Sequence, residues 1–263
     1  MNLRKLTNSM IRGIKGPFMS KPVSNEGSYS YSHLNKDANK YHKKFNDEAS
    51  RSIIWNIEKD LIDNISSKYG PFDIHLDFAG GTGRIAGLLE EQCNDQYILD
   101  ISEKMLSVAR KDLKNIKIIC RDFRKGVSEL QENNIDLVTA FRFFPNAEVE
   151  LRESAMNFIA SKVKNGGLLM CNNHINFWSV PVFFKRLFFL GGLAGMSNKE
   201  MIELASDNGF ILIKTYSMGV FPQTGRKAFV SWRFVKWFEK LMFNRFGTKH
   251  RIGQNVVFVF KQI

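Results

Sequence analysis

The chain has 263 residues, of which 44% are hydrophobic and 24% charged, and these shares are typical of a globular protein with one core. Its net charge is +12 at pH 7, and the excess is uneven, because nine Lys/Arg residues from residue 221 onward accompany a single acid, Glu239. Cys93, Cys120 and Cys171 are far apart and belong to no CxxC or Cys/His cluster, which excludes a disulfide framework and predicts no metal site.

No segment is typical of a signal peptide or of a membrane-spanning helix. The basic N-terminal stretch has no continuous apolar run of signal-peptide length. The most apolar stretch, residues 177–194, is interrupted by Pro181, Lys185 and Arg186, whereas a spanning helix needs about 20 predominantly apolar residues. We therefore expect a cytoplasmic protein. The basic C-terminal segment leaves open a peripheral contact with an anionic membrane or with RNA.

The first part of the chain predicts a flexible arm followed by a helix. Residues 1–37 are rich in Ser, Asn, Gly and Lys. From about residue 37 to residue 67, four isoleucines and Leu61 recur at three- and four-residue spacing, which indicates a helix that ends at the Gly-Pro pair 70–71. Residues 38–263 are expected to form one domain.

Beyond this helix, short apolar runs that predict strands alternate with segments of helical periodicity. The predicted strands comprise residues 73–78, 97–100, 116–120, 135–141, 167–172, 210–216 and 255–260. The predicted helices comprise residues 84–92, 102–113, 147–164 and 198–208. This alternation is typical of an α/β fold, in which a mostly parallel sheet, here of seven strands, carries helices on both faces. Ligands of such sheets bind at the carboxyl ends of the strands, so we expect the site in the loops after the first five strands.

The loop after the first predicted strand, DFAGGTGR at residues 77–84, is rich in glycine. Gly81 and Gly83 allow a sharp turn and a close approach of the backbone to a ligand. Asp100 ends the second predicted strand, where a carboxylate can accept hydrogen bonds from both hydroxyls of a ribose. These features predict a nucleoside-containing cofactor. Because residues 81–86 also fit the pattern G-x-G-x-x-A, an NAD-dependent oxidoreductase stays an alternative.

Several segments resemble the class I methyltransferases, whose fold is Rossmann-like and whose methyl donor is S-adenosylmethionine. Residues 77–83, DFAGGTG, resemble their motif I, D-x-G-x-G-x-G, with alanine in place of the first glycine. Residues 100–110 are similar to the segment that follows their second strand, and the Asp-Phe pair 122–123 matches their adenine-contacting pair. The resemblance covers roughly residues 70–172 and implies an S-adenosylmethionine-dependent methyltransferase.

The resemblance also implies which residues hold the cofactor. Asp77 would face the ammonium group of the methionine part, Asp100 the ribose, and Asp122 the exocyclic amine of adenine. A helix that begins at Arg84 would offer its N–H groups to the carboxylate of the cofactor. A carboxylate at Asp77 suits an ammonium group but would repel the pyrophosphate of NAD. The residues implied to bind the cofactor are Asp77, Ala79, Gly80, Gly81, Gly83, Arg84, Asp100, Ile101, Met105, Asp122, Phe123 and Phe141.

His174 is the candidate general base for methyl transfer. It lies directly beyond the fifth predicted strand, and histidine is suited to remove the proton of a hydroxyl acceptor. The alternative is a histidine that only caps the strand end. Residues 141–146 lack the Asn/Asp-Pro-Pro-Tyr motif of enzymes that methylate exocyclic or amide nitrogens. Arg142 and Asn146 in this loop are candidates for binding the acceptor, and an ion pair between Arg142 and a nearby glutamate is the alternative for that side chain.

Residues 176–196 and 226–246 are expected to form helical lids over the acceptor, and Tyr31 and Tyr41 of the N-terminal arm are expected to contact it. The apolar face of the second segment is expected to dock on the sheet, and its alternative is to lie on an anionic membrane. That face comprises Val230, Phe234, Trp237, Phe238 and Leu241.

These features together predict an enzyme that O-methylates a small or carrier-linked metabolite of the sugar or lipid type, for which an anionic acceptor would suit the basic chain. An RNA-directed methyltransferase is the alternative, because of the basic C-terminal segment.

Overall fold

The structure, a computed structural model, describes residues 34, 38, 48–131, 133–176, 179–182, 195–221, 230–247 and 252–263. Its strands are β1 (Phe72–Phe78), β2 (Cys93–Asp100), β3 (Lys117–Cys120), β4 (Ile135–Ala140), β5 (Val163–Asn173), β6 (Phe210–Met218) and β7 (Asn255–Gln262). All seven coincide with strands predicted from the sequence.

The seven strands form one sheet in the order β3-β2-β1-β4-β5-β7-β6. The first five strands pair in parallel, whereas β7 is antiparallel to both β5 and β6. The prediction of a mostly parallel, Rossmann-like sheet is therefore confirmed. Because β6 runs parallel to β5, the strands β1 to β6 all end at one edge of the sheet, which we call the carboxyl edge.

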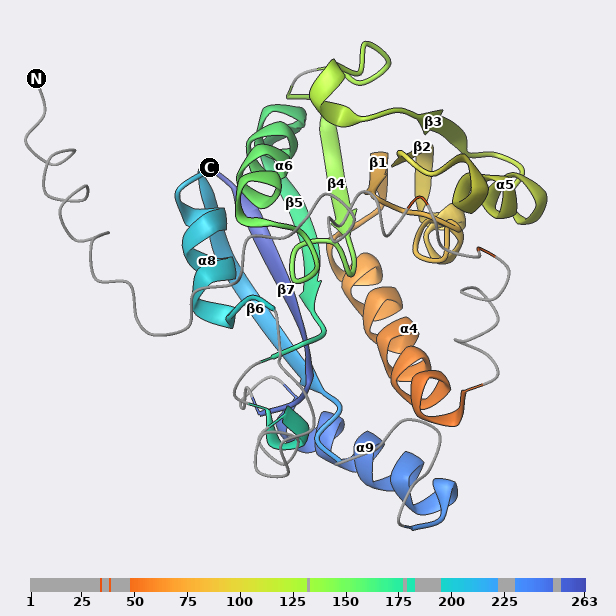
Figure 1. Ribbon diagram of the computed structural model, residues 1–263, viewed down its shortest axis with the longest axis vertical. Helices are drawn as coiled ribbons and strands as arrows, with labels where there is room; N and C mark the ends of the chain where they lie inside the picture. The colour runs from red at the N-terminus through yellow and green to blue at the C-terminus, as the bar shows by residue number, and fades with distance from the viewer. Residues whose placement is uncertain are drawn as a thin grey trace, which may run out of the picture.

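Helices cover both faces of this sheet (Figure 1). They are α4 (Ala49–Tyr69), α5 (Glu103–Asp112), α6 (Val149–Lys162), α8 (Asn198–Ser206) and α9 (Trp232–Phe246). Side chains of α6 and α8 share a buried cluster with one face of the sheet. Side chains of α4 and α9 share another with the opposite face, which α5 also covers. The core is thus split into two layers by the sheet.

The helix predicted over residues 84–92 is absent, and this prediction was wrong. The chain turns through residues 81–85 and then forms two single-turn 3₁₀ helices, η2 (Ala86–Leu88) and η3 (Glu90–Gln92). The amide N–H of Ala86 donates to Asp77 Oδ2 over 3.3 Å. The amide N–H groups of Leu88, Leu89 and Gln92 donate to carbonyls three residues back, which closes 3₁₀ turns in place of the four-residue bonds of an α-helix.

The basic helix α9 docks through a different face from the one expected. Val235 and Glu239 are buried, whereas Phe234, Trp237 and Leu241 are 44%, 57% and 46% exposed. Of the other expected lid, residues 177–178 and 183–194 lie outside the described residues. Within the described part of the chain, no helix combines the length and hydropathy that crossing a bilayer requires.

Candidate functional site

The loop after β1 turns sharply because three of its residues adopt left-handed backbone conformations. Ala79, Gly81 and Gly83 have φ angles of 54°, 57° and 72°. The turn brings the amide N–H of Gly81 within 2.9 Å of Asp100 Oδ2, which ties the loop to the end of β2. A Cβ atom on Gly83 would lie 2.4 Å from Leu113 Cδ1, so glycine is required there for space as well as for its φ angle.

Asp77 lies beneath this loop and does not line a pocket. Its side chain is 1% exposed, Oδ1 accepts a hydrogen bond of 2.8 Å from Thr139 Oγ1, and Oδ2 accepts one from Ala86. Burial raises the pKa of Asp77 to about 7. A Cβ atom on Gly80 would lie 2.7 Å from the carboxylate, so Asp77 and Gly80 pack directly against each other. In the structure Asp77 thus holds the loop against β4, and its contact with the ammonium group of the cofactor stays a prediction.

A pocket opens at the carboxyl edge, beyond the ends of β1 to β4. The residues that line it are Phe78, Ala79, Leu99, Asp100, Ile101, Arg121, Asp122, Phe123, Arg124, Phe143 and Leu151. Five of the residues predicted to hold the cofactor are among them: Ala79, Asp100, Ile101, Asp122 and Phe123. The expected location, in the loops that follow the strands, agrees with this pocket.

Both carboxylates and aromatic side chains line the pocket. The rings of Phe123 and Phe143 meet the ring of Phe78 edge-on, at centroid distances of 5.2 and 5.1 Å. Asp100 is 3% exposed, and its Oδ1 accepts the amide N–H of Ser102 over 2.8 Å. An apolar slot with a few fixed polar atoms is the usual construction of a site for a nucleoside.

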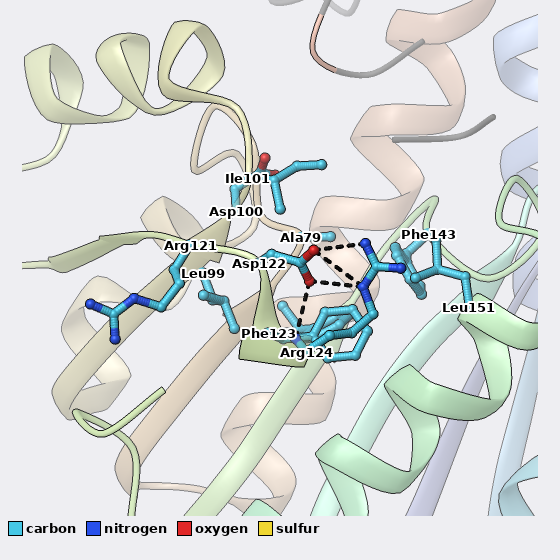
Figure 2. Close-up of a pocket in the computed structure, with 11 residues that line it drawn as sticks. Ala79, Leu99, Asp100, Ile101, Arg121, Asp122, Phe123, Arg124, Phe143 and Leu151 are labelled. Carbon is cyan, nitrogen blue, oxygen red and sulfur yellow. Dashed lines mark hydrogen bonds and ion pairs between the residues drawn. The ribbon is translucent and has the colours of Figure 1, made fainter. Parts of the chain in front are cut away.

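Asp122 and Arg124 form an ion pair at this pocket, and Figure 2 shows the guanidinium of Arg124 beside the carboxylate. Arg124 Nη2 lies 2.7 Å from Asp122 Oδ2, and Arg124 Nε lies 3.0 Å from Oδ1. These hydrogen bonds hold the pKa of Asp122 below its usual value. The sequence had given no role to Arg124. Its position directly after the Asp-Phe pair was the available signal.

Phe141 was predicted to contact the cofactor. In the structure it lies in the core, and Phe143 lines the pocket instead. Between them Arg142 has a φ of 62°, so the chain reverses its course just after β4. Met105 is 1% exposed and also lies outside the pocket lining. Its Cε is 3.3 Å from the point where a Cβ of Gly81 would stand, so Met105 supports the loop from below.

The side chain of Arg84 binds α4, whereas the sequence analysis had assigned its backbone N–H to the cofactor. Its Nη1 lies 3.1 Å from Glu58 Oε2, and its guanidinium carbon is 3.8 Å from the centroid of the Trp55 ring. Glu58 itself is completely buried, and its Oε1 accepts from the side-chain amides of Asn172 and Asn255 over 3.3 and 2.9 Å. This buried cluster, which the sequence did not reveal, ties α4 to β5 and β7 at the carboxyl edge.

The three described candidates for acceptor chemistry lie around the same edge. His174 directly follows β5 and is partly buried, and it does not belong to the pocket lining. The amide N–H of Arg142 donates to Asn172 Oδ1 over 2.6 Å, and the exposed Asn146 donates to the carbonyl of Arg142 over 2.5 Å. Tyr31 and Tyr41 lie outside the described residues. No group of three or more metal-ligating side chains exists among the residues described.

A family model of a methyltransferase domain matches residues 76–171 of the chain. This segment contains the loop after β1, the ends of β2 to β4 and every residue that lines the pocket. A search of curated proteins finds no match.

Solved structures with the same fold include several methyltransferases. A methyltransferase from Thermotoga maritima, described as a possible histamine N-methyltransferase, has a TM-score of 0.63 at 15% identity and covers 89% of this chain and 100% of its own. The magnesium protoporphyrin IX methyltransferase of Synechocystis PCC 6803, solved with S-adenosylmethionine, has a TM-score of 0.58 at 12% identity, covering 93% and 100%. An N-methyltransferase of Bradyrhizobium japonicum WM9, solved with S-adenosylhomocysteine, has a TM-score of 0.57 at 11% identity, covering 88% and 95%.

The matched family segment coincides with the strands and loops that build the pocket, and the fold around it is that of cofactor-bound methyltransferases. Residues 76–171 therefore form a methyltransferase domain, and the chain has the Rossmann-like fold of the class I methyltransferases that depend on S-adenosylmethionine.

Proposed function

We propose that this methyltransferase O-methylates a small or carrier-linked acceptor of the sugar or lipid type, with His174 as general base. The observation that carries the proposal is the position of His174, half-buried at the first residue beyond β5 on the carboxyl edge. The loop after β4 supports an oxygen acceptor, because its sequence FRFFPN offers no amine-gripping Pro-Pro motif. The structural neighbours do not decide the acceptor, since their identity of 11–15% extends to the fold alone.

The residues of the pocket fit the adenosyl part of S-adenosylmethionine. Asp100 lies where ribose hydroxyls could donate to it, and Phe78, Phe123 and Phe143 offer an apolar wall for adenine. Gly81 has no side chain at the point where the loop approaches Asp100. A Cβ atom there would lie 3.8 Å from Asp100 Oδ2. When bound, S-adenosylmethionine supplies an electrophilic methyl group on a positively charged sulfur.

The chain itself contributes position and proton removal. The rigid loops of the carboxyl edge would hold the acceptor oxygen in line with the methyl carbon, which replaces a costly bimolecular encounter. His174 would take the hydroxyl proton as the new C–O bond forms and the C–S bond breaks, and would then release that proton to solvent. A positioned base of this kind accelerates a reaction by roughly 10²–10⁴-fold.

Paired variants test these assignments. Asp100→Ala should weaken S-adenosylhomocysteine binding by about 1–3 kcal/mol in calorimetry, through the loss of ribose hydrogen bonds. His174→Ala should leave that affinity nearly unchanged but slow methyl transfer, and added imidazole should restore part of the rate. The opposite pattern, weak binding with normal turnover in His174→Ala, refutes the assignment of the base.

The acceptor class is tested with labelled methyl donor and fractionated cell extract. We expect the label in small or lipid-extractable products that carry methyl ethers or esters. Label that is released only by ribonuclease would replace this proposal with an RNA-directed methyltransferase.

A further inference from the structure

Helix α9 is fixed to the body of the protein through its inner face. Glu239, its only acidic residue, accepts three consecutive backbone N–H groups from residues 219–221, at 3.0, 3.1 and 2.5 Å. Val235 is fully buried beside it, and the amide N–H of Ser217 in β6 donates to the carbonyl of Gly247 just beyond the helix over 2.7 Å. These contacts set the rotation of the helix about its axis.

The opposite side of α9 carries an apolar stripe, Phe234, Trp237 and Leu241, which we call the outer stripe. Its members follow at three- and four-residue spacing and are 44%, 57% and 46% exposed. Phe234 also contacts the ring of Trp237 at a centroid distance of 5.7 Å. Every exposed Phe or Trp among the described residues lies on this helix. Large aromatic side chains grouped on a surface mark an interaction site more often than single exposed apolar residues do.

Cations border the outer stripe. Arg233, Lys236 and Lys240, which we call the basic flank, are exposed and recur at helical spacing along one side of the stripe. Arg245 is exposed toward the C-terminal end of the same helix. Within the part of the chain that the structure describes, none of the four forms an ion pair. Since Glu239 is buried, every charged side chain on the outward side of α9 is a cation.

We propose that the outer stripe and the basic flank form a docking surface for an anionic lipid membrane. An exposed apolar stripe with flanking Lys and Arg is the arrangement with which a helix lies in the interface of a bilayer, its rings among the acyl chains and its cations at the phosphates. RNA would satisfy the cations and could stack on Phe234 and Trp237, but it offers nothing apolar against which the aliphatic Leu241 would be buried. The combination therefore favours a membrane.

The docking surface lies on the side of the protein where the reaction takes place. The residues that Glu239 holds directly follow the end of β6, which is part of the carboxyl edge, and α9 also packs against α4. The cofactor pocket opens at the same edge. A membrane bound through α9 would bring membrane-resident acceptors to that edge. The inference extends the proposed function but does not depend on it, since binding to lipid needs no acceptor.

Co-sedimentation of the full chain with vesicles tests the proposal. We expect binding to phosphatidylcholine vesicles that contain phosphatidylglycerol, weaker binding to pure phosphatidylcholine, and a loss of binding as salt is raised. Replacing the outer stripe, Phe234→Ser with Trp237→Ser and Leu241→Ser, should abolish binding. Replacing the basic flank by glutamine should lower the partition coefficient by about fivefold per residue, or roughly 100-fold in total.

A matched control, the α5 variant, removes two exposed cations from α5 and one just beyond it, through Lys104→Gln, Lys111→Gln and Lys114→Gln. This variant has the same net charge as the flank variant and should bind vesicles nearly as well as the parent. Unchanged S-adenosylhomocysteine affinity in every variant shows that folding is intact. The proposal is overturned if the parent does not bind anionic vesicles, if the α5 and flank variants lose binding equally, or if an RNA oligonucleotide binds and the stripe variant retains that affinity.

Discussion

The carboxylate of Asp77 accepts a hydrogen bond of 2.8 Å from the hydroxyl of Thr139, across two neighbouring strands in the middle of the sheet. Because that hydroxyl donates to Asp77, its oxygen accepts the Nε2–H of His75 over 2.9 Å. The side-chain amide of Gln96 in turn donates to His75 Nδ1 over 3.0 Å and to the carbonyl of Ala86 over 3.2 Å. The network thus assigns a neutral His75 with its proton on Nε2, and it links the loop after β1 to three strands.

The two titratable groups of this network should give folding stability opposite dependences on pH. Burial raises the pKa of Asp77 from 3.8 to about 7, so the folded chain retains a proton that the unfolded chain releases. The contribution of Asp77 to the free energy of unfolding therefore falls as pH rises through this window. Burial lowers the pKa of His75 from 6.5 to about 3, so its contribution rises with pH over its own window.

Single variants should separate these two effects. Relative to the parent, Asp77→Asn should make the free energy of unfolding rise more steeply with pH, and His75→Gln should make it fall more steeply. Each change in slope should approach about 1.4 kcal/mol per pH unit between roughly pH 4 and pH 6.5. Urea unfolding at several pH values measures both slopes. Two variants with the slope of the parent would show that neither group titrates as the burial implies.

Replacing Ala79 by glycine should stabilise the protein. The left-handed φ of 54° costs an alanine about 1–2 kcal/mol, while the added freedom of glycine in the unfolded chain costs about 0.4–1 kcal/mol. A net gain of up to about 1 kcal/mol is expected in urea unfolding. The matched control is Gly83→Ala, which places a Cβ 2.4 Å from Leu113 at a φ of 72° and should destabilise clearly. A loss of stability in Ala79→Gly would contradict the strain assigned to this turn.

Removing Arg124 should slightly strengthen cofactor binding. Its guanidinium occupies the carboxylate of Asp122, which the adenine amine is expected to reach, so the two compete for the same oxygens. Arg124 is exposed, and an exposed ion pair contributes at most about 1 kcal/mol, so Arg124→Ala should tighten S-adenosylhomocysteine by no more than about fivefold. Calorimetry should find weaker binding for Asp122→Ala. If Arg124→Ala weakens binding as much, Arg124 contacts the cofactor directly.

Removing the buried carboxylate of Glu58 should destabilise the protein strongly. Glu58→Ala removes the buried carboxylate that binds the guanidinium of Arg84 and accepts from two asparagine amides, so a loss of about 3–5 kcal/mol is expected. Glu58→Gln keeps an acceptor oxygen and should lose less. Asp60→Ala, at an exposed site on the same helix, is the control and should change stability by less than about 0.5 kcal/mol. If the denaturant midpoints of the three variants agreed within error, the role assigned to this cluster would be refuted.

The alternation of apolar runs determined the seven strands, their mostly parallel arrangement and the position of the site at the carboxyl edge. Asp100 could be placed at this edge because it ends a strand, whereas Asp122 and Phe123 were placed there by their resemblance to the adenine-contacting pair of the class I methyltransferases, and all three line the pocket. The same reasoning failed for residues 84–92, where backbone N–H groups bond to carbonyls three residues back and form 3₁₀ turns in place of an α-helix.

Tertiary structure alone decided which side chains meet. Phe143 replaces Phe141 in the pocket because Arg142 adopts a φ of 62°, a single dihedral angle that no periodicity encodes. Glu58 and Asn255 are 197 residues apart, yet they share a hydrogen bond in the core. Sequence spacing specifies contacts within a helix or strand. Contacts between distant segments depend instead on how whole helices and strands pack. That packing buries a carboxylate such as that of Glu58 among its hydrogen-bond partners.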